Sequence, residues 1–104
     1  MAHVITPITR LLIANRGEIA RRIMRTAHDM GISTVAIYAD ADANAPFVNE
    51  ADSAVALNGR TTAETYLDVG KVLDACRRSG ADAIHPGYGF LSENEAFALS
   101  LIHI

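Results

Sequence analysis

The sequence predicts one α/β domain in which a parallel β-sheet is covered by helices on both faces. Short apolar segments with the character of buried strands alternate with segments whose apolar residues recur at helical spacing. Such alternation is typical of parallel sheets built with right-handed crossovers. The chain has 104 residues, half of them hydrophobic, which is enough for one domain with its own core.

The first strand is predicted at residues 11–14, an apolar run. Asn15 follows as a candidate N-cap, and Glu18 stands three residues later, where it would complete a capping box. The helix that they open is expected to end at Gly31, which is placed to adopt the left-handed conformation. Its apolar face consists of Ile19, Ala20, Ile23, Met24 and Ala27.

Residues 34–39 are rich in β-branched and aromatic side chains and predict the second strand. A polar loop is expected over residues 40–46, followed by one helical turn over residues 47–51. The third strand is predicted at residues 53–57, and the Asn-Gly pair at residues 58–59 indicates the turn that closes it.

The second long helix is expected after a capping box formed by Thr61 and Glu64, and it is expected to end at Gly80. Its predicted apolar face carries Tyr66, Val69, Val72, Leu73 and Cys76.

Residues 81–85 predict the fourth strand, and a glycine-bearing loop is expected over residues 86–91. Ser92 and Glu95 would form a last capping box, which opens a helix through residue 99. Right-handed crossovers favour the strand order 3-2-1-4, in which the chain returns to the far side of the first strand.

In a sheet of this order the reversal lies between strands one and four, and ligands bind beyond the carboxyl ends of the strands at that point. Residues 15–18 and 86–92 form the two loops there. Tyr88 lies between Gly87 and Gly89, so the backbone N–H groups could face an anion while the ring lies against a flat ligand. The alternative is a tight turn with Tyr88 as half-buried packing.

Other polar residues near these loops have structural interpretations. His85 at a strand end is interpreted as a structural histidine rather than a base, and Arg16 as a residue that flanks the first helix rather than one that contacts an anion. Arg22, Arg25 and Asp29 stand three and four residues apart and share one helix face. They form either a solvated ion-pair face or an interface with another domain or subunit.

Charge is distributed unevenly along the chain. Residues 1–30 contain five Arg against two acidic residues, whereas residues 31–59 contain four acidic residues and no Lys or Arg. We interpret these as solvated faces of one fold, and the alternative is that the basic first helix meets a partner or an anion. The net charge of −3 argues against nucleic acid or an anionic membrane as the main partner.

Cys76 is the only cysteine, so no disulfide can form within the chain. This favours a reducing compartment, and we expect a cytoplasmic protein with a buried, inert thiol. No segment approaches the roughly 18 apolar residues of a membrane span. No metal site is predicted, and neither a G-x-G-x-x-G motif nor a Walker loop follows the first strand.

Residues 12–20 (LIANRGEIA) and 84–94 (IHPGYGFLSEN) resemble the two signature stretches of biotin carboxylases, and residues 65–67 (TYL) are also similar to that family. The likeness covers roughly residues 9–98, and the second stretch is highly specific. The resemblance implies a Rossmann-like, three-layer α/β domain of the kind that precedes an ATP-grasp domain.

The resemblance also implies an activity for the longer parent, that of an ATP-dependent ligase which carboxylates biotin on a carrier protein with bicarbonate. ATP activates the bicarbonate as carboxyphosphate, and the ureido nitrogen of biotin takes the carboxyl group. In the family this step feeds the carboxylation of acetyl-CoA, as in fatty acid biosynthesis, of propionyl-CoA or other acyl-CoA, or of pyruvate. The implied partners are the ATP-grasp and C-terminal domains, the biotin carboxyl carrier domain, the carboxyltransferase and, in some members, a second copy of the chain.

The family's catalytic residues and its main contacts to MgATP lie in those further domains, so the chain alone is expected to be inactive and to bind no cofactor tightly. The family pattern places Tyr88 and Gly89 at the biotin and bicarbonate end of the site, with Glu93 close by. It places three residues at the subunit interface of some members, namely Arg22, Arg25 and Asp29.

The family-like domain is expected to span residues 1–98 and to be truncated. Residues 99–104 (LSLIHI) are apolar and depart from the family pattern, which leads to the hypothesis that they are not native. Native codons for these six residues in the gene would contradict it. The alternative function is a stand-alone Rossmann-like module that binds a small ligand or docks on a partner through its arginine face.

Overall fold

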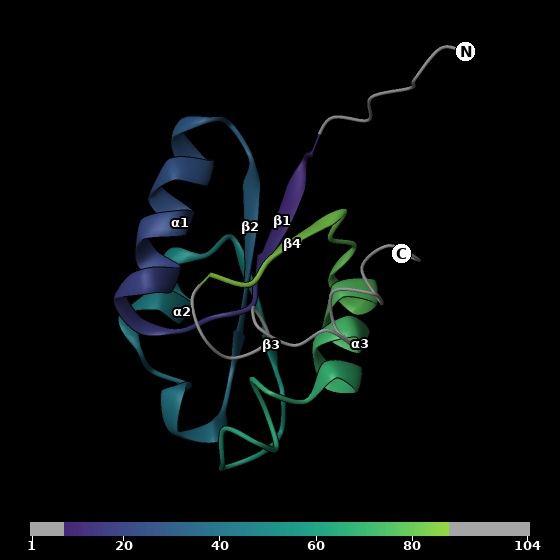
Figure 1. The fold of residues 1–104 in the computed structure, drawn as a ribbon. Coiled ribbons are helices and arrows are strands. Elements are labelled where there is room, and N and C mark those ends of the chain that lie inside the picture. Colours follow the sequence, from purple (N-terminus) through teal and green to yellow (C-terminus); the bar gives the residue numbers. More distant parts are fainter. Residues whose placement is uncertain (1–7, 88–104) are drawn as a thin grey trace, which may run out of the picture.

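The computed structural model describes residues 8–87, and within them the sheet has four parallel strands in the order β3-β2-β1-β4 (Figure 1). The strands are β1 (Arg10–Ile13), β2 (Ser33–Tyr38), β3 (Ser53–Ala56) and β4 (Ala83–His85). The helices are α1 (Gly17–Asp29), the 3-10 helix η1 (Asp40–Asp42), α2 (Pro46–Glu50) and α3 (Val69–Ser79). The predicted class and strand order are confirmed, whereas the helix predicted through residue 99 lies outside the described residues.

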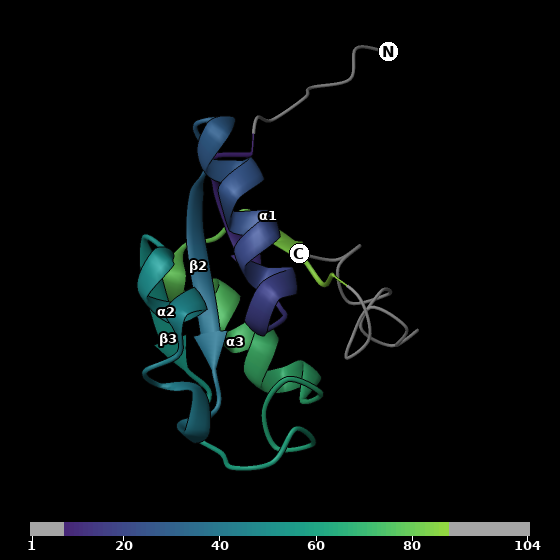
Figure 2. The same ribbon diagram turned by 90° about the vertical axis from the view of Figure 1, so that its left-hand side faces the viewer.

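Helices α1 and α2 lie on one face of the sheet and α3 lies on the other (Figures 1 and 2). Side chains alternate along a strand, so neighbouring residues of β1 point to opposite faces. Leu12 belongs to the cluster that includes Val72 of α3, whereas Ile13 belongs to the cluster that includes Met24 of α1. The sheet therefore has a hydrophobic core on each face, as the three-layer prediction requires.

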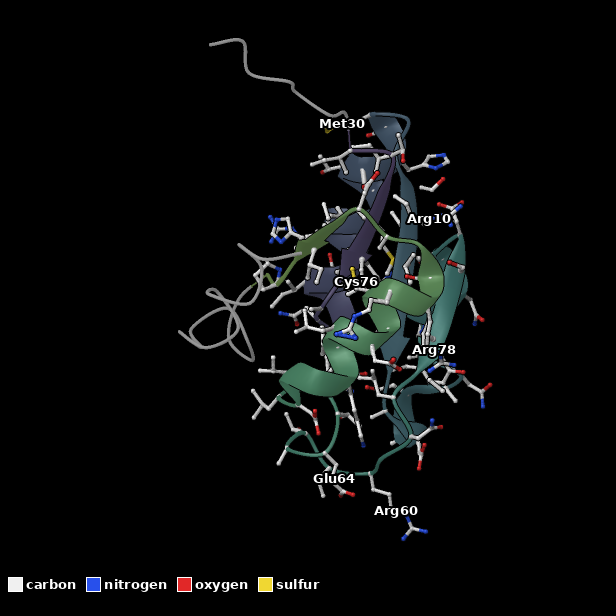
Figure 3. The ribbon with its side chains drawn as sticks, turned by 90° about the vertical axis from the view of Figure 1, so that its right-hand side faces the viewer. Arg10, Met30, Arg60, Glu64, Cys76 and Arg78 are labelled. Carbon is white, nitrogen blue, oxygen red and sulfur yellow. The ribbon has the colours of Figure 1, made fainter. Side chains whose placement is uncertain are left out.

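Cys76 lies where α3 meets the sheet (Figure 3). Its side chain is buried, and its Sγ lies 3.5 Å from the carbonyl oxygen of Ala81. Burial raises the pKa of the thiol above its ordinary value, because the charged thiolate is disfavoured away from water. The expectation of a buried thiol is confirmed, and the raised pKa makes it a poor nucleophile at neutral pH.

The start of α1 differs from the prediction. The helix begins at Gly17, and its N-cap is Arg16, which makes no side-chain cap hydrogen bond. The predicted capping box of Asn15 and Glu18 is therefore wrong. The Asn15 side chain bonds to the loop after β4, and the Glu18 side chain pairs with a later arginine of the same helix.

The predicted capping box of Thr61 and Glu64 does form, but it does not open α3. Thr61 Oγ1 donates to Glu64 Oε1 at 2.8 Å, and Glu64 N donates to Thr61 Oγ1 at 3.2 Å. This pair closes a turn, and α3 begins later, at Val69. Asp68 is the N-cap, and its Oδ1 accepts a hydrogen bond from Lys71 N at 3.0 Å.

Both predicted helix ends are confirmed, since Gly31 and Gly80 adopt left-handed φ values of 76° and 73°. The polar loop expected over residues 40–46 instead contains η1, and α2 begins at Pro46, whose fixed φ suits the first position of a helix. Among the helices that the structure describes, none is long and apolar enough to cross a membrane.

Candidate functional site

The first predicted loop lies beside the described start of the second, residues 86–87. Ile13, the last residue of β1, pairs with His85, the last residue of β4. Ala14 N then donates to His85 O at 2.9 Å, and Asn15 Nδ2 donates to Pro86 O at 2.9 Å. The side chain of Asn15 thus joins the segment after β1 to the segment after β4, which are 71 residues apart in the sequence.

Gly87 has a conformation and an environment that require glycine. Its φ is 66°, in the left-handed region that other residues rarely adopt. A Cβ built on it would lie 2.8 Å from Asn15 Nδ2 and 3.0 Å from Ile19 Cγ2. The Gly87 N–H donates to His85 Nδ1 at 3.1 Å, which supports the structural interpretation of His85.

A second polar cluster, which we call the Asp42 cluster, consists of Asp42, Arg16 and Tyr66. Arg16 forms a two-bond pair with the carboxylate, with Nε 2.8 Å from Oδ2 and Nη2 2.6 Å from Oδ1. The Tyr66 hydroxyl donates to the same Oδ2 at 2.6 Å and accepts a hydrogen bond from Ala39 N at 3.1 Å. The cluster therefore ties the N-cap of α1 to η1 and to the segment before α3.

The Asp42 cluster shifts the proton affinity of its members in opposite directions. The hydrogen bonds from the Arg16 guanidinium, more than any other cause, hold the pKa of the Asp42 carboxyl below its ordinary value. Burial, followed by the hydrogen bond to the Asp42 carboxylate, raises the pKa of Tyr66 well above its ordinary value. At neutral pH the cluster is thus an ionised carboxylate held by a guanidinium and a neutral phenol.

We expect the stabilisation from Asp42 to disappear in acid. A carboxyl whose pKa is lower in the folded chain contributes stability above its unfolded pKa of about 3.9, and this stability is lost as pH falls through the folded value. The difference in unfolding free energy between the chain and its Asp42→Asn variant should therefore be smaller at about pH 3 than at about pH 7. Urea denaturation at both pH values measures it, and a difference that does not change would contradict the expectation.

Asp42 is not among the predicted site residues, and the sequence places it only in a polar loop. Arg16 flanks α1 as predicted, at its N-cap. Its guanidinium also pairs with the carboxylate of Asp42. The uneven charge was the available signal, because both Arg16 to Asp42 and Arg21 to Glu50 join the basic segment to the acidic one.

The three residues predicted for an interface lie on the exposed side of α1 but line two different grooves. Arg22 lines an apolar groove between α1 and the edge strand β4. Arg25 and Asp29 line a more polar groove, which also includes Glu50. Arg25 pairs with Glu18, its Nη2 lying 3.0 Å from Oε1. Their role at an interface remains a prediction.

The residues predicted for the biotin end of the site, Tyr88, Gly89 and Glu93, lie outside the described residues. The described part of that loop ends at Gly87, whose place beside Asn15 is set by the contacts above. Within residues 8–87, no group of three or more His, Cys, Asp or Glu side chains is arranged to hold a metal ion.

Comparisons with known proteins agree on one family. A family model described as the biotin carboxylase N-terminal domain matches residues 7–103. The chain is 56% identical over 101 residues to the biotin-dependent acyl-coenzyme A carboxylase alpha3 subunit of Mycobacterium leprae, covering 97% of this chain and 17% of that protein. It is 55% identical over 92 residues to the propionyl-CoA carboxylase alpha chain of Ruegeria pomeroyi, covering 88% of this chain and 14% of that protein.

Solved structures with the same fold belong to similarly long proteins. The crystal structure of the K. lactis urea amidolyase superposes with a TM-score of 0.91 at 54% identity, covering 92% of this chain and 6% of that one. The crystal structure of the pyruvate carboxylase from Rhizobium etli superposes with a TM-score of 0.87 at 42% identity, covering 94% of this chain and 10% of that one. The chain therefore spans only a small part of each of these relatives.

Proposed function

We propose a function from one premise, which is that this chain belongs to the biotin carboxylase N-terminal domain family. The proposal is that the domain forms one wall of the site at which an ATP-dependent ligase carboxylates carrier-bound biotin with bicarbonate. The observation that carries it is the bond from Asn15 to Pro86, through which the two stretches that resemble the family meet at the carboxyl edge of the sheet. This edge is where parallel α/β sheets bind ligands.

The chain's share of the reaction is to bind and orient substrate rather than to perform the chemistry. We assign Tyr88 and Gly89 to the biotin and bicarbonate end of the site, with Glu93 nearby, and we assign no catalytic residue to this chain. MgATP is a substrate of the whole ligase and would be held by its ATP-grasp and C-terminal domains.

The acceptor of the carboxyl group is proposed only as a class. The relatives are named as carboxylases of acyl-CoA, propionyl-CoA, methylcrotonoyl-CoA, urea and pyruvate. We propose an acyl-CoA, acetyl-CoA included, or pyruvate, chosen by a separate carboxyltransferase. Further proposed partners are the biotin carboxyl carrier domain and a second copy of the chain bound through Arg22, Arg25 and Asp29. The single cysteine supports a reducing compartment such as the cytoplasm.

A chimera tests the proposal. Residues 9–98 replace the matched residues of the Ruegeria pomeroyi propionyl-CoA carboxylase alpha chain, and bicarbonate-dependent ATP cleavage and carboxylation of free biotin are measured. We expect the chimera to be active, and the 104-residue chain alone to show no bicarbonate-dependent ATP hydrolysis, because it lacks the nucleotide-binding domains.

Two outcomes would contradict the proposal. One is a chimera that folds and melts like its parent but carboxylates no biotin. The other is turnover by the chain alone. Calorimetry of the chain alone with nucleotides, biotin and acyl-CoA adds a further check, since tight nucleotide binding would favour a stand-alone binding module.

A further inference from the structure

The hydrogen bonds between β1 and β4 continue past the ends of the strands through a side chain. Among residues 8–87, the last bond between the two backbones runs from Ala14 N to His85 O at 2.9 Å. The next residue of the second segment, Pro86, has no N–H to donate, so only its carbonyl can be held. Asn15 Nδ2 donates to that carbonyl at 2.9 Å.

Asn15 is itself held in place. Its side chain is 1% exposed, and its Oδ1 accepts a hydrogen bond from Arg16 N at 2.8 Å. These two bonds set the orientation of the amide, with the NH₂ group toward Pro86. The reverse orientation would place Oδ1 against the Pro86 carbonyl oxygen, which is also an acceptor, and Nδ2 against the Arg16 N–H, which is also a donor. A buried amide so fixed is a rigid support for the loop that it contacts.

Gly87 fits against this support closely. Its Cα has no room for a Cβ beside Asn15 Nδ2, and its N–H is taken by His85 Nδ1. As the backbone leaves β4, neighbouring side chains therefore hold the Pro86 carbonyl and the Gly87 N–H, and Asn15 leaves no space for a Cβ at Gly87.

From these contacts we propose that Asn15 is a positioning residue, which sets where the Gly-Tyr-Gly loop starts by holding Pro86 O and closing the space beside Gly87. Its effect on biotin rests on the function proposed above, in which the next two residues of that loop lie at the biotin end of the site. Displacement of a substrate-binding group by about 1 Å can cost up to a hundredfold in rate, so support of this kind matters to a ligase.

The Asn15→Asp variant tests this, because it keeps the shape of the side chain and replaces the donor by a carboxylate, which only accepts hydrogen bonds when ionised. In the 104-residue chain, we expect hydrogen exchange of the Gly87 amide, followed by NMR, to become at least about tenfold faster as the loop is released. In the chimera, we expect KM for free biotin to rise by roughly tenfold or more while KM for ATP stays unchanged.

Thr34→Val is the matched control. Thr34 is also buried, at 3% exposure, and its Oγ1 makes a hydrogen bond with Asp52, at the opposite end of the sheet from the carboxyl edge. A loss of stability alone should appear in both variants. Only Asn15→Asp should speed the exchange of the Gly87 amide and raise KM for biotin without raising KM for ATP.

The inference is overturned if Gly87 exchanges in the Asn15→Asp chain at the same rate as in the parent. It is also overturned if an active Asn15→Asp chimera shows the pattern of the Thr34→Val chimera, with equal changes in both KM values or none. A chimera that is inactive without any substitution would count against the proposed function instead. The exchange rate of the Gly87 amide in the 104-residue chain would then still decide whether Asn15 positions the loop.

Discussion

Replacing Asp42 by alanine is expected to lower the unfolding free energy of the 104-residue chain by about 3 kcal/mol. Asp42 is 7% exposed, and its carboxylate accepts two hydrogen bonds from Arg16 and one from Tyr66. Its removal leaves a guanidinium and a buried hydroxyl without the acceptor around which they are arranged. The Arg16 side chain is 50% exposed and can regain water, which places the cost at the lower end of the range for broken buried pairs.

Asp40→Ala is the matched control for this prediction. Asp40 lies two residues earlier, at the start of the same 3-10 helix, and its side chain is exposed. We expect its loss to change stability by no more than about 0.5 kcal/mol. Urea denaturation followed by circular dichroism measures both variants, and equal values would show that the Asp42 cluster does not stabilise the fold.

Gly87→Ala is expected to have the second large effect, a loss of roughly 2–4 kcal/mol in unfolding free energy. Two costs add together. A non-glycine residue at φ 66° costs about 1–2 kcal/mol. A methyl group 2.8 Å from Asn15 Nδ2 and 3.0 Å from Ile19 Cγ2 also forces the buried Asn15 side chain and the half-buried Ile19 side chain to move.

Gly31→Ala separates these two costs. Gly31 also has a positive φ, 76°, but a Cβ built on it meets nothing within 4 Å. We expect this variant to lose only the conformational cost of about 1–2 kcal/mol. The two midpoints of urea denaturation, compared at equal m values, give the difference, and a Gly87→Ala loss no larger than that of Gly31→Ala would refute the close fit to Asn15.

Some misses in the sequence-based prediction share one physical cause. A capping box is recognised by spacing along the chain, but the Asn15 side chain bonds to a carbonyl 71 residues away. Tyr66 has the right spacing for the apolar face of α3, yet it lies before the helix with its hydroxyl on Asp42, 24 residues away. Local patterns cannot show which distant partner competes for a polar side chain.

Asp40 and Asp42 illustrate the same limit. Both are acidic residues in one short polar segment, and nothing in their spacing distinguishes them. Asp40 is exposed, whereas Asp42 is the buried residue of the 3-10 helix and accepts hydrogen bonds from Arg16 and Tyr66. The lowered pKa of Asp42 and its expected effect on stability follow from that placement.

The sequence by itself determined the class, the strand order, both glycine helix ends and the edge of the sheet where the two motif loops meet. These depend on apolar periodicity, backbone chirality and the handedness of crossovers, which can be inferred from a single sequence. Only the tertiary structure decided that Asn15 supports the loop after β4 and that Arg16 is paired with Asp42. Those contacts depend on which polar groups the packed strands and helices bring within about 3 Å of each other. The spacing of residues along the sequence does not predict positions to that precision.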